Sequence, residues 1–276
     1  MAESNMKIRF FWITSLFFLL AACATSPLGR RQFIWLPDSV VDSLGSSSFA
    51  QMKTEVTNNK SPEEQKFVDC VVDALLKANQ IPGKWEVVVF KRSEANAFAS
   101  PPGKIGVFTG ILPITNTQDK LAAVLGHEIG HVLARHANER LSTALPLQIA
   151  LSVASGFVPG GVQGEKIMNL LGMGTKLGVI LPNSRADETE ADRLGLRLMA
   201  RAGFDPREAA ALWRAMAKAG GARPLEFLST HPAPKTRIAT LQKEIPLFIP
   251  VAEEARRSGF APQCVPPPQK ENKEKS

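Results

Sequence analysis

The chain has 276 residues, of which 44% are hydrophobic and 21% are charged, and its formal net charge is +7. This length and composition fit one large or two small globular domains, and they exclude a wholly disordered chain or a multi-span membrane protein. Because the chain has only three cysteines and four histidines, it cannot be a disulfide-dense scaffold, and any metal site must draw on very few residues.

The N-terminus has the pattern of an export signal. Lys7 and Arg9 precede an apolar run, residues 10–22, which is too short to span a membrane comfortably. The run ends in Leu-Ala-Ala-Cys at residues 20–23, which resembles the bacterial lipobox. An ordinary signal peptide whose cleavage site happens to contain a cysteine is the alternative.

The lipobox interpretation predicts where the protein resides. We expect residues 1–22 to be a lipoprotein signal peptide and Cys23 to carry the lipid that holds the protein at a membrane. Ala24 follows the cysteine, and the absence of Asp there favours the outer membrane. We therefore expect a lipid-anchored protein of the outer membrane that faces the periplasm. Nucleic acid is not an expected partner, since no nucleic-acid motif is present.

The other two cysteines suggest one disulfide. Cys70 and Cys264 would both remain after lipidation of the first cysteine, and an oxidising compartment favours their pairing. Two separate thiols are the alternative, because the sequence gives no distance between them. Residues 23–60 are rich in Ser, Asn and Pro, and we expect them to form a tether.

The middle of the chain predicts a helix followed by a small sheet. Ser61 and Glu64 form a capping-box pattern before an apolar stripe that ends near residue 79. Two β-rich segments, residues 85–90 and 104–109, surround residues 96–99 and a Pro-Pro-Gly turn. This order is typical of a small antiparallel sheet.

Helices dominate the rest. Periodicity and breakers predict them at residues 117–141, 184–202, 206–220 and 234–244, with an apolar, Gly-rich segment at 142–181 that we expect to cover a cleft or to pack as plain helix. The sequence thus predicts a mostly helical α+β domain over residues 61–250. Residues 251–276 would form a C-terminal extension that is partly disordered.

The sharpest motif is His-Glu-Ile-Gly-His at residues 127–131. His127 and His131 are four positions apart on the predicted helix, so both imidazoles lie on one face and can bind one tetrahedral Zn²⁺ ion. Glu128 lies about 100° around the helix, where it can reach a zinc-bound water as a general base. A chance match on a charged helix is the alternative, and the small number of histidines argues against it.

A catalytic zinc needs a third protein ligand. His136 would point about 180° away from His127 on a straight helix, so we expect it on another face. Glu188 and Asp192 are one turn apart on a second helix. Glu188 is therefore the candidate ligand, and Asp192 could accept a hydrogen bond from a ligand histidine. We expect Glu190 to be solvated, because it points away from Glu188.

These motifs together resemble a known family. The HExxH motif followed by S-R-x-x-E-x-E-A-D at residues 184–192 is similar to the gluzincin zinc peptidases of the HtpX, BepA and LoiP type, which are related to the CAAX prenyl proteases. The segment Asn96-Ala97-Phe98-Ala99 and the later Ser-Thr-His-Pro at residues 229–232 also resemble that family. The chain lacks the spanning helices of the integral-membrane members, so the resemblance favours the periplasmic lipoprotein branch.

The resemblance implies roles for individual residues. His127, His131 and Glu188 would bind one Zn²⁺ ion, with Glu128 as the general base. His231 would be an active-site histidine that donates to the oxyanion or occupies the open zinc position. Arg237 would pair with an acid near the site, bind substrate or form a structural salt bridge.

The resemblance also implies a substrate-binding strand. Residues 104–109 would be an edge strand to which an extended peptide adds, with Asn96, Ile105 and Val107 in contact with it. We therefore expect a zinc endopeptidase that cleaves unfolded or misassembled envelope proteins by Glu-assisted attack of a zinc-bound water, in contact with outer-membrane assembly machinery. The alternative is an outer-membrane lipoprotein chaperone or assembly factor with little proteolytic turnover.

Overall fold

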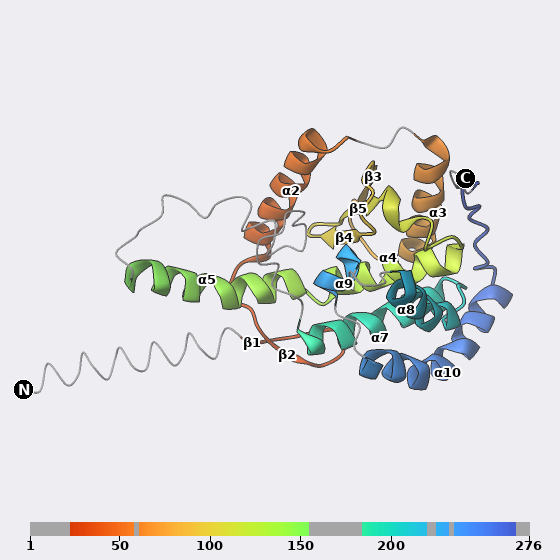
Figure 1. The fold of residues 1–276 in the computed structure, drawn as a ribbon. Helices are drawn as coiled ribbons and strands as arrows, with labels where there is room; N and C mark the ends of the chain where they lie inside the picture. Colours follow the sequence, from red (N-terminus) through yellow and green to blue (C-terminus); the bar gives the residue numbers. More distant parts are fainter. Residues whose placement is uncertain (1–22, 58–60, 155–183, 220–224, 232–234, 269–276) are drawn as a thin grey trace, which may run out of the picture.

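The computed structural model describes residues 23–57, 61–154, 184–219, 225–231 and 235–268. Helices pack around a three-stranded sheet, with a two-stranded hairpin at the N-terminal end (Figure 1). The predicted mostly helical α+β fold is confirmed. The expected signal peptide and most of the expected cover at 142–181 lie outside the described residues. Among the helices that are described, none combines the length and apolarity needed to cross a membrane.

The three-stranded sheet has one central strand and two edge strands. Its order is β3 (Glu86–Phe90), β5 (Lys104–Phe108), β4 (Ala97–Ser100), with β3 parallel and β4 antiparallel to β5. The sheet is thus mixed, and only its β4–β5 half has the expected antiparallel pairing. The expectation that residues 104–109 form an edge strand is wrong, because β5 is paired on both sides. The strand with an unpaired edge toward the helices that follow is β4.

The two faces of the sheet are covered by different helices. Alternate residues such as Val89, Ile105 and Val107 join a core with α3 (Pro62–Ala78) and α4 (Gln118–Leu133). The other face carries three phenylalanines that pack against α2 (Asp38–Glu55) and the start of α5 (His136–Ala154), namely Phe90, Phe98 and Phe108. Figure 1 shows α2 and α3 on opposite sides of the strands. The sheet is therefore buried on both faces.

The N-terminal residues are part of the fold, and the expectation of a tether over 23–60 is wrong. β1 (Cys23–Thr25) pairs with β2 (Arg31–Phe33) in a hairpin, and α2 follows. α2 packs closely because its residues are small: a Cβ atom on Gly45 would lie 2.0 Å from the carbonyl oxygen of Pro101. Gly45 and Ser48, two of the small residues that suggested a tether, are therefore buried where α2 packs.

The centre of the molecule is the contact between α4 and α7 (Arg185–Arg201). Gly126 and Gly130 on α4 and Gly195 on α7 let the two backbones approach. A Cβ atom on Gly195 would lie 3.0 Å from the amide nitrogen of His127. This close approach sets the distance between the histidine motif and the acidic motif.

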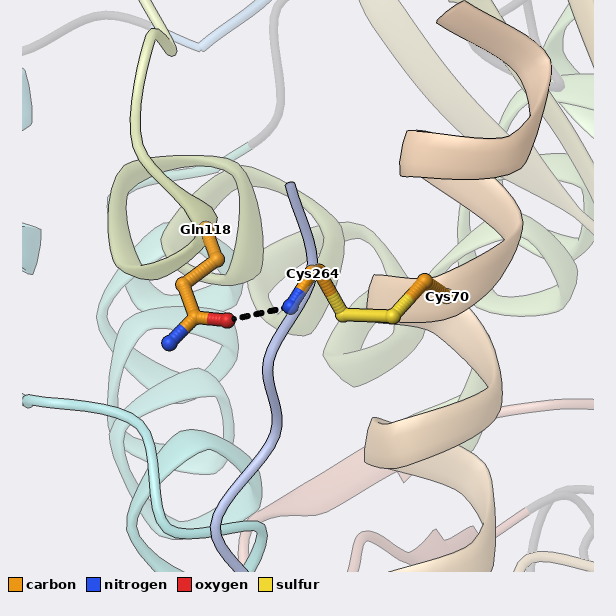
Figure 2. Close-up of a disulfide and its surroundings, with 3 residues drawn as sticks. All are labelled: Cys70, Gln118 and Cys264. Atoms are coloured by element: carbon orange, nitrogen blue, oxygen red, sulfur yellow. Dashed lines mark hydrogen bonds between the residues drawn. A yellow bond between two sulfur atoms is a disulfide. The ribbon is translucent and has the colours of Figure 1, made fainter. Parts of the chain in front are cut away.

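The C-terminal helices close the core, and a disulfide fixes the end of the described chain. α8 (Arg207–Ala219), the short α9 (Glu226–Thr230) and α10 (Lys235–Arg257) follow α7. Cys264 forms a disulfide with Cys70 of α3, and its backbone amide donates to the side-chain oxygen of Gln118 at the start of α4 (Figure 2). The expected boundary at residue 250 is wrong, because α10 continues through it without a break.

Candidate metal centre

The histidine pair lies on the buried face of α4. Thr117 caps this helix by accepting a hydrogen bond from the amide of Lys120, and the following apolar residues bury it against the sheet and α7. His127 and His131 are 3% and 6% exposed, so both imidazoles are held away from bulk water. Their Nε2 atoms lie 3.1 Å apart, as expected for two side chains one turn apart that face the same point.

α7 and the end of α9 supply the other two groups. Ser184 and Asp187 form a capping box that starts α7, and Glu188 follows in its first turn with its carboxylate between the histidines. Its Oε2 atom lies 3.4 Å from Nε2 of His127, and its Oε1 atom lies 3.4 Å from Nε2 of His131. Nδ1 of His231 lies 3.2 Å from Nε2 of His127.

The spacing of these donor atoms matches a tetrahedral zinc site. Ligand atoms at about 2.0–2.1 Å from a tetrahedral ion are separated from one another by about 3.3 Å. Five separations between donor atoms of His127, His131, Glu188 and His231 lie between 2.9 and 3.4 Å. The imidazoles of His127 and His131 and the carboxylate of Glu188 are also a donor set used by catalytic zinc, and His231 lies beside the fourth position. The buried group therefore fits one Zn²⁺ ion.

The electrostatics of the cluster favour one positive charge. Burial by itself disfavours a charged His127, but the carboxylates of Glu188 and Asp192 outweigh that effect and raise its pKa to about 9. Burial lowers the pKa of His131 well below its usual value. A bound zinc ion would supply the positive charge that the two acids favour, and it would compete with protons for the histidines.

Asp192 and Arg237 surround the ligands. Oδ1 of Asp192 lies 3.1 Å from Nδ1 of His127, the ring nitrogen that faces away from the other donors. The guanidinium of Arg237 donates to the same carboxylate at 2.8 Å and pairs with Glu188, and it stacks 4.0 Å from the ring centre of Trp213. The structure thus places both residues beside the site, where the sequence predicted them.

Glu128 is held against the edge strand. The amide of Phe108 donates to the carbonyl of Asn96, and this bond sets the phase of the β4–β5 ladder, so that Ala97 and Ala99 direct their backbone groups away from β5. The amide of Ala99 accordingly donates to Oε2 of Glu128 at 3.2 Å. The other carboxylate oxygen, Oε1, lies 3.3 Å from Nε2 of His231.

The expected substrate-binding residues divide into two groups. Asn96 is buried at the start of β4, where its side-chain oxygen accepts from the amide of Ala97. Ile105 and Val107 are fully buried on the central strand, within the core. They cannot offer a free backbone edge to a peptide, because β5 is paired on both sides.

His136 and Glu190 do not lie where the sequence predicted them, on another helix face and in solvent respectively. α4 ends at Leu133, and Arg135 takes a left-handed backbone conformation with φ of 57°, so the chain turns and brings His136 back beneath His131. Their Nδ1 atoms lie 2.7 Å apart, and Nε2 of His136 lies 3.2 Å from Oε2 of Glu190. Both residues are buried. Nothing local in the sequence signals this turn, because Arg is no marker for a left-handed residue.

Comparison with known proteins agrees with this geometry. Residues 62–245 match the model of peptidase family M48. The chain belongs to this family. The predicted zinc peptidase of the gluzincin type is therefore confirmed at the level of the family, with a site for one zinc ion.

Relatives with assigned names share much of the sequence. The chain is 41% identical over 165 residues to the mitochondrial metalloendopeptidase OMA1 of Schizosaccharomyces pombe, an alignment that covers 59% of this chain and 47% of that protein. It is 35% identical over 247 residues to OMA1 of Saccharomyces cerevisiae, with 82% and 70% covered. It is 30% identical over 169 residues to the β-barrel assembly-enhancing protease of Escherichia coli, with 59% and 34% covered. The match thus spans less than half of the first and third relatives.

These names overturn the predicted location. The two OMA1 relatives at the higher identities are mitochondrial, so the expectation of a lipid-anchored protein at the outer membrane, facing the periplasm, is wrong. That expectation depended on the signal-like N-terminus, on residues 20–23 and on Ala24, and residues 1–22 lie outside the described structure. Lipid attachment at Cys23 depended on the same residues, and no observation supports it.

Proposed function

We propose that this protein is a zinc-dependent endopeptidase that cleaves unfolded or misassembled polypeptides in an extended conformation. The observation that carries the proposal is the juxtaposition of a zinc-type donor set, the carboxylate of Glu128 and the edge of β4. Two relatives support it, since one is a metalloendopeptidase and the other a β-barrel assembly-enhancing protease.

The edge of β4 suits an extended substrate. Among the described residues, no strand lies on the other side of β4, and the carbonyl groups of Ala97 and Ala99 are directed to that side. An added peptide strand would pair through its backbone, so side chains would contribute little to selection. Such recognition favours substrates that lack stable structure, because a folded protein does not offer an extended segment.

The residues around the site divide the chemistry among them. Zinc, when bound, supplies a Lewis acid and lowers the pKa of water. Glu128, fixed by the Ala99 amide, would accept a proton at Oε1 from the attacking water and pass it to the leaving amine. His231 would donate a hydrogen bond to the developing oxyanion. Asp192 would keep His127 in the orientation that presents its Nε2 atom.

Substitution of Glu128 tests the assignment. We expect Glu128→Gln to keep its zinc and to lose about 10²–10⁴-fold in the rate of casein cleavage, because only the proton transfer is removed. Glu63→Gln, on the exposed face of α3, is the matched control and should cleave as wild type does. Undiminished cleavage by Glu128→Gln would contradict the proposal. A chaperone without turnover is not favoured, since the base and the donor set are both complete.

A further inference from the structure

We propose that His136 is a positioning residue for the zinc site, and that the β1–β2 hairpin supports His136 in this role. His136 would fix the ring of His131 through its Nδ1 atom. Glu190 would in turn fix His136, and Arg30 of the hairpin would hold Glu190. The inference rests on the zinc site described above, but not on the identity of the substrate.

The hydrogen bonds allow one consistent assignment of protons. A histidine that binds zinc through Nε2 carries its proton on Nδ1, so His131 donates from Nδ1 to the Nδ1 atom of His136, 2.7 Å away. His136 must then carry its own proton on Nε2, which faces Oε2 of Glu190 at 3.2 Å. The ionised carboxylate accepts that hydrogen bond. The result is a series of hydrogen bonds from the zinc ligand His131 to the imidazole of His136 and from there to the carboxylate of Glu190. Every donor in this series has an acceptor.

This series of hydrogen bonds extends by one residue the known effect of outer groups on a ligand histidine. Outer groups that accept a hydrogen bond from a ligand histidine fix its tautomer and ring orientation, and they increase its basicity. His127 has such a group directly, in the carboxylate of Asp192. The Nδ1 atom of His131 faces an imidazole instead. This second imidazole conveys the effect of Glu190 to the ligand.

The hairpin supplies the charge that keeps Glu190 in place. Nε of Arg30 donates to Oε2 of Glu190 at 2.8 Å, and its two terminal nitrogens pair with Glu139 at 2.9 and 2.6 Å and with Asp187 at 2.8 Å. The hydroxyl of Ser26 also donates to Glu190. One guanidinium thus joins three carboxylates that come from α5 and α7.

Without Arg30, three acids would lie close together with little positive charge to balance them. Their mutual repulsion would favour outward movement of Glu190, and the orientation of His136 would be lost with it. The hairpin begins at Cys23, immediately after the apolar run of residues 10–22. The hairpin is therefore connected to the metal ligand His131 through Arg30, Glu190 and His136.

Substitutions at His136 distinguish positioning from packing. In His136→Asn the amide oxygen takes the place of Nδ1 and can still accept from His131, whereas in His136→Gln the amide reaches toward Glu190 and away from His131. We expect the full chain to bind zinc about 10–100-fold more weakly in the Gln and Ala variants, with a smaller loss in the Asn variant. Titration against a chelator of known affinity measures these losses, and thermal unfolding of the metal-free variants reports their stability.

Two further measurements make the test decisive. The visible absorption spectrum of the Co²⁺-substituted protein should change in His136→Gln and stay close to wild type in His136→Asn, because it reports the ligand geometry. Arg30→Gln should weaken zinc binding, while Arg31→Gln, a neighbour whose side chain is exposed, should not. Equal zinc affinity in wild type and His136→Gln, or equal effects of Arg30→Gln and Arg31→Gln, would overturn the proposal. If a His136 variant lost proteolysis but bound zinc as wild type does, the positioning role of His136 would be contradicted. The role of Glu128 as general base would not be affected by that result.

Discussion

The carboxylate of Asp192 contacts both His127 and Arg237, at 3.1 Å and 2.8 Å respectively. It therefore orients a metal ligand and at the same time pairs with a buried guanidinium that also contacts Glu188. In Asp192→Asn the amide loses the charge that Arg237 pairs with, and the guanidinium is left with Glu188, a ligand candidate, as its acidic partner. We expect zinc affinity to fall by about 10–100-fold.

Zinc-dependent stabilisation measures this loss. A ligand that binds only the folded state raises the free energy of unfolding by an amount that depends on its concentration relative to Kd. The melting temperature of wild type should therefore rise with added zinc at concentrations that leave Asp192→Asn unaffected. Glu244→Gln, in a surface pair with Arg193, is the control. An unchanged zinc response in Asp192→Asn would show that Asp192 does not support His127.

The disulfide between Cys70 and Cys264 predicts a large loss of stability on its removal. It closes a loop with a sequence separation of 194 residues, and cross-links of long loops stabilise chiefly by restricting the unfolded chain. We expect the Cys70→Ser/Cys264→Ser variant to lose about 2–5 kcal/mol in the free energy of unfolding. Denaturant titration measures it. A reducing agent should destabilise wild type to the same extent and leave the variant unchanged, and a wild type insensitive to reduction would contradict the pairing.

The sequence predicted what depends on local periodicity. His127 and His131 were predicted on one face because four helical positions fix their relation, and the same argument placed Glu188 and Asp192 together. The structure brings His127, His131 and Glu188 to one point and places Asp192 behind His127. The helix phase failed for His136, since that argument assumed a straight helix beyond Leu133. A left-handed residue at Arg135 ends that phase, and the residue type gives no sign of it.

Long-range pairing and close packing were outside what the sequence could show. The strands β3 and β5 were predicted, but they pair in parallel, an arrangement that no local turn specifies, and the hairpin of β1 and β2 was not predicted. The same limit made residues 23–60 look like a tether. Small residues such as Gly45 and Ser48 read as linker composition, yet both are buried where α2 meets its neighbours. Composition alone does not distinguish a flexible segment from one that packs closely.

The approach of α4 to α7 predicts that a single methyl group disturbs the metal site. In Gly195→Ala the new Cβ atom would lie 3.0 Å from the amide nitrogen of His127 and 3.2 Å from the carbonyl carbon of Gly126. Both contacts are backbone atoms, so relief requires the two helices to separate. We expect a loss of about 1–3 kcal/mol in stability together with weaker zinc binding, because the ligands come from both helices.

Another glycine substitution offers the comparison. Gly83 has φ of 99°, and a Cβ atom added to it would meet none of the described atoms within 4 Å, so Gly83→Ala strains the backbone without separating packed elements. Denaturant titration and zinc competition should show lower stability in both variants and weaker zinc binding in Gly195→Ala alone. Equal zinc affinity in the two variants would indicate that the helix spacing does not control the site.

The ion pairs of Glu86 predict a pH-dependent contribution from α2. Hydrogen bonds from Lys104 and Lys53 hold the pKa of Glu86 below its usual value of about 4.5, and Lys53 lies on α2. A carboxyl group whose pKa is lowered by folding stabilises the fold above its unfolded pKa and loses that effect as the pH falls through the folded value. These side chains are more than a third exposed in the Glu86–Lys53 pair, so solvent screening keeps the gain at about 0.2–1 kcal/mol.

Glu86→Gln should therefore be less stable than wild type at pH 7, and the difference should shrink as the pH falls from the unfolded pKa of Glu86 through its lower folded pKa. High salt should reduce the difference at pH 7, because it screens exposed charges. Denaturant titration from pH 7 into the acid range measures the difference in the free energy of unfolding. Glu63→Gln is the control, because the carboxylate of Glu63 makes no such pair in the described structure. A difference that persisted in acid would point to packing of the side chain rather than its charge. If wild type and Glu86→Gln had the same free energy of unfolding at every pH, the pair would not hold α2 to the sheet.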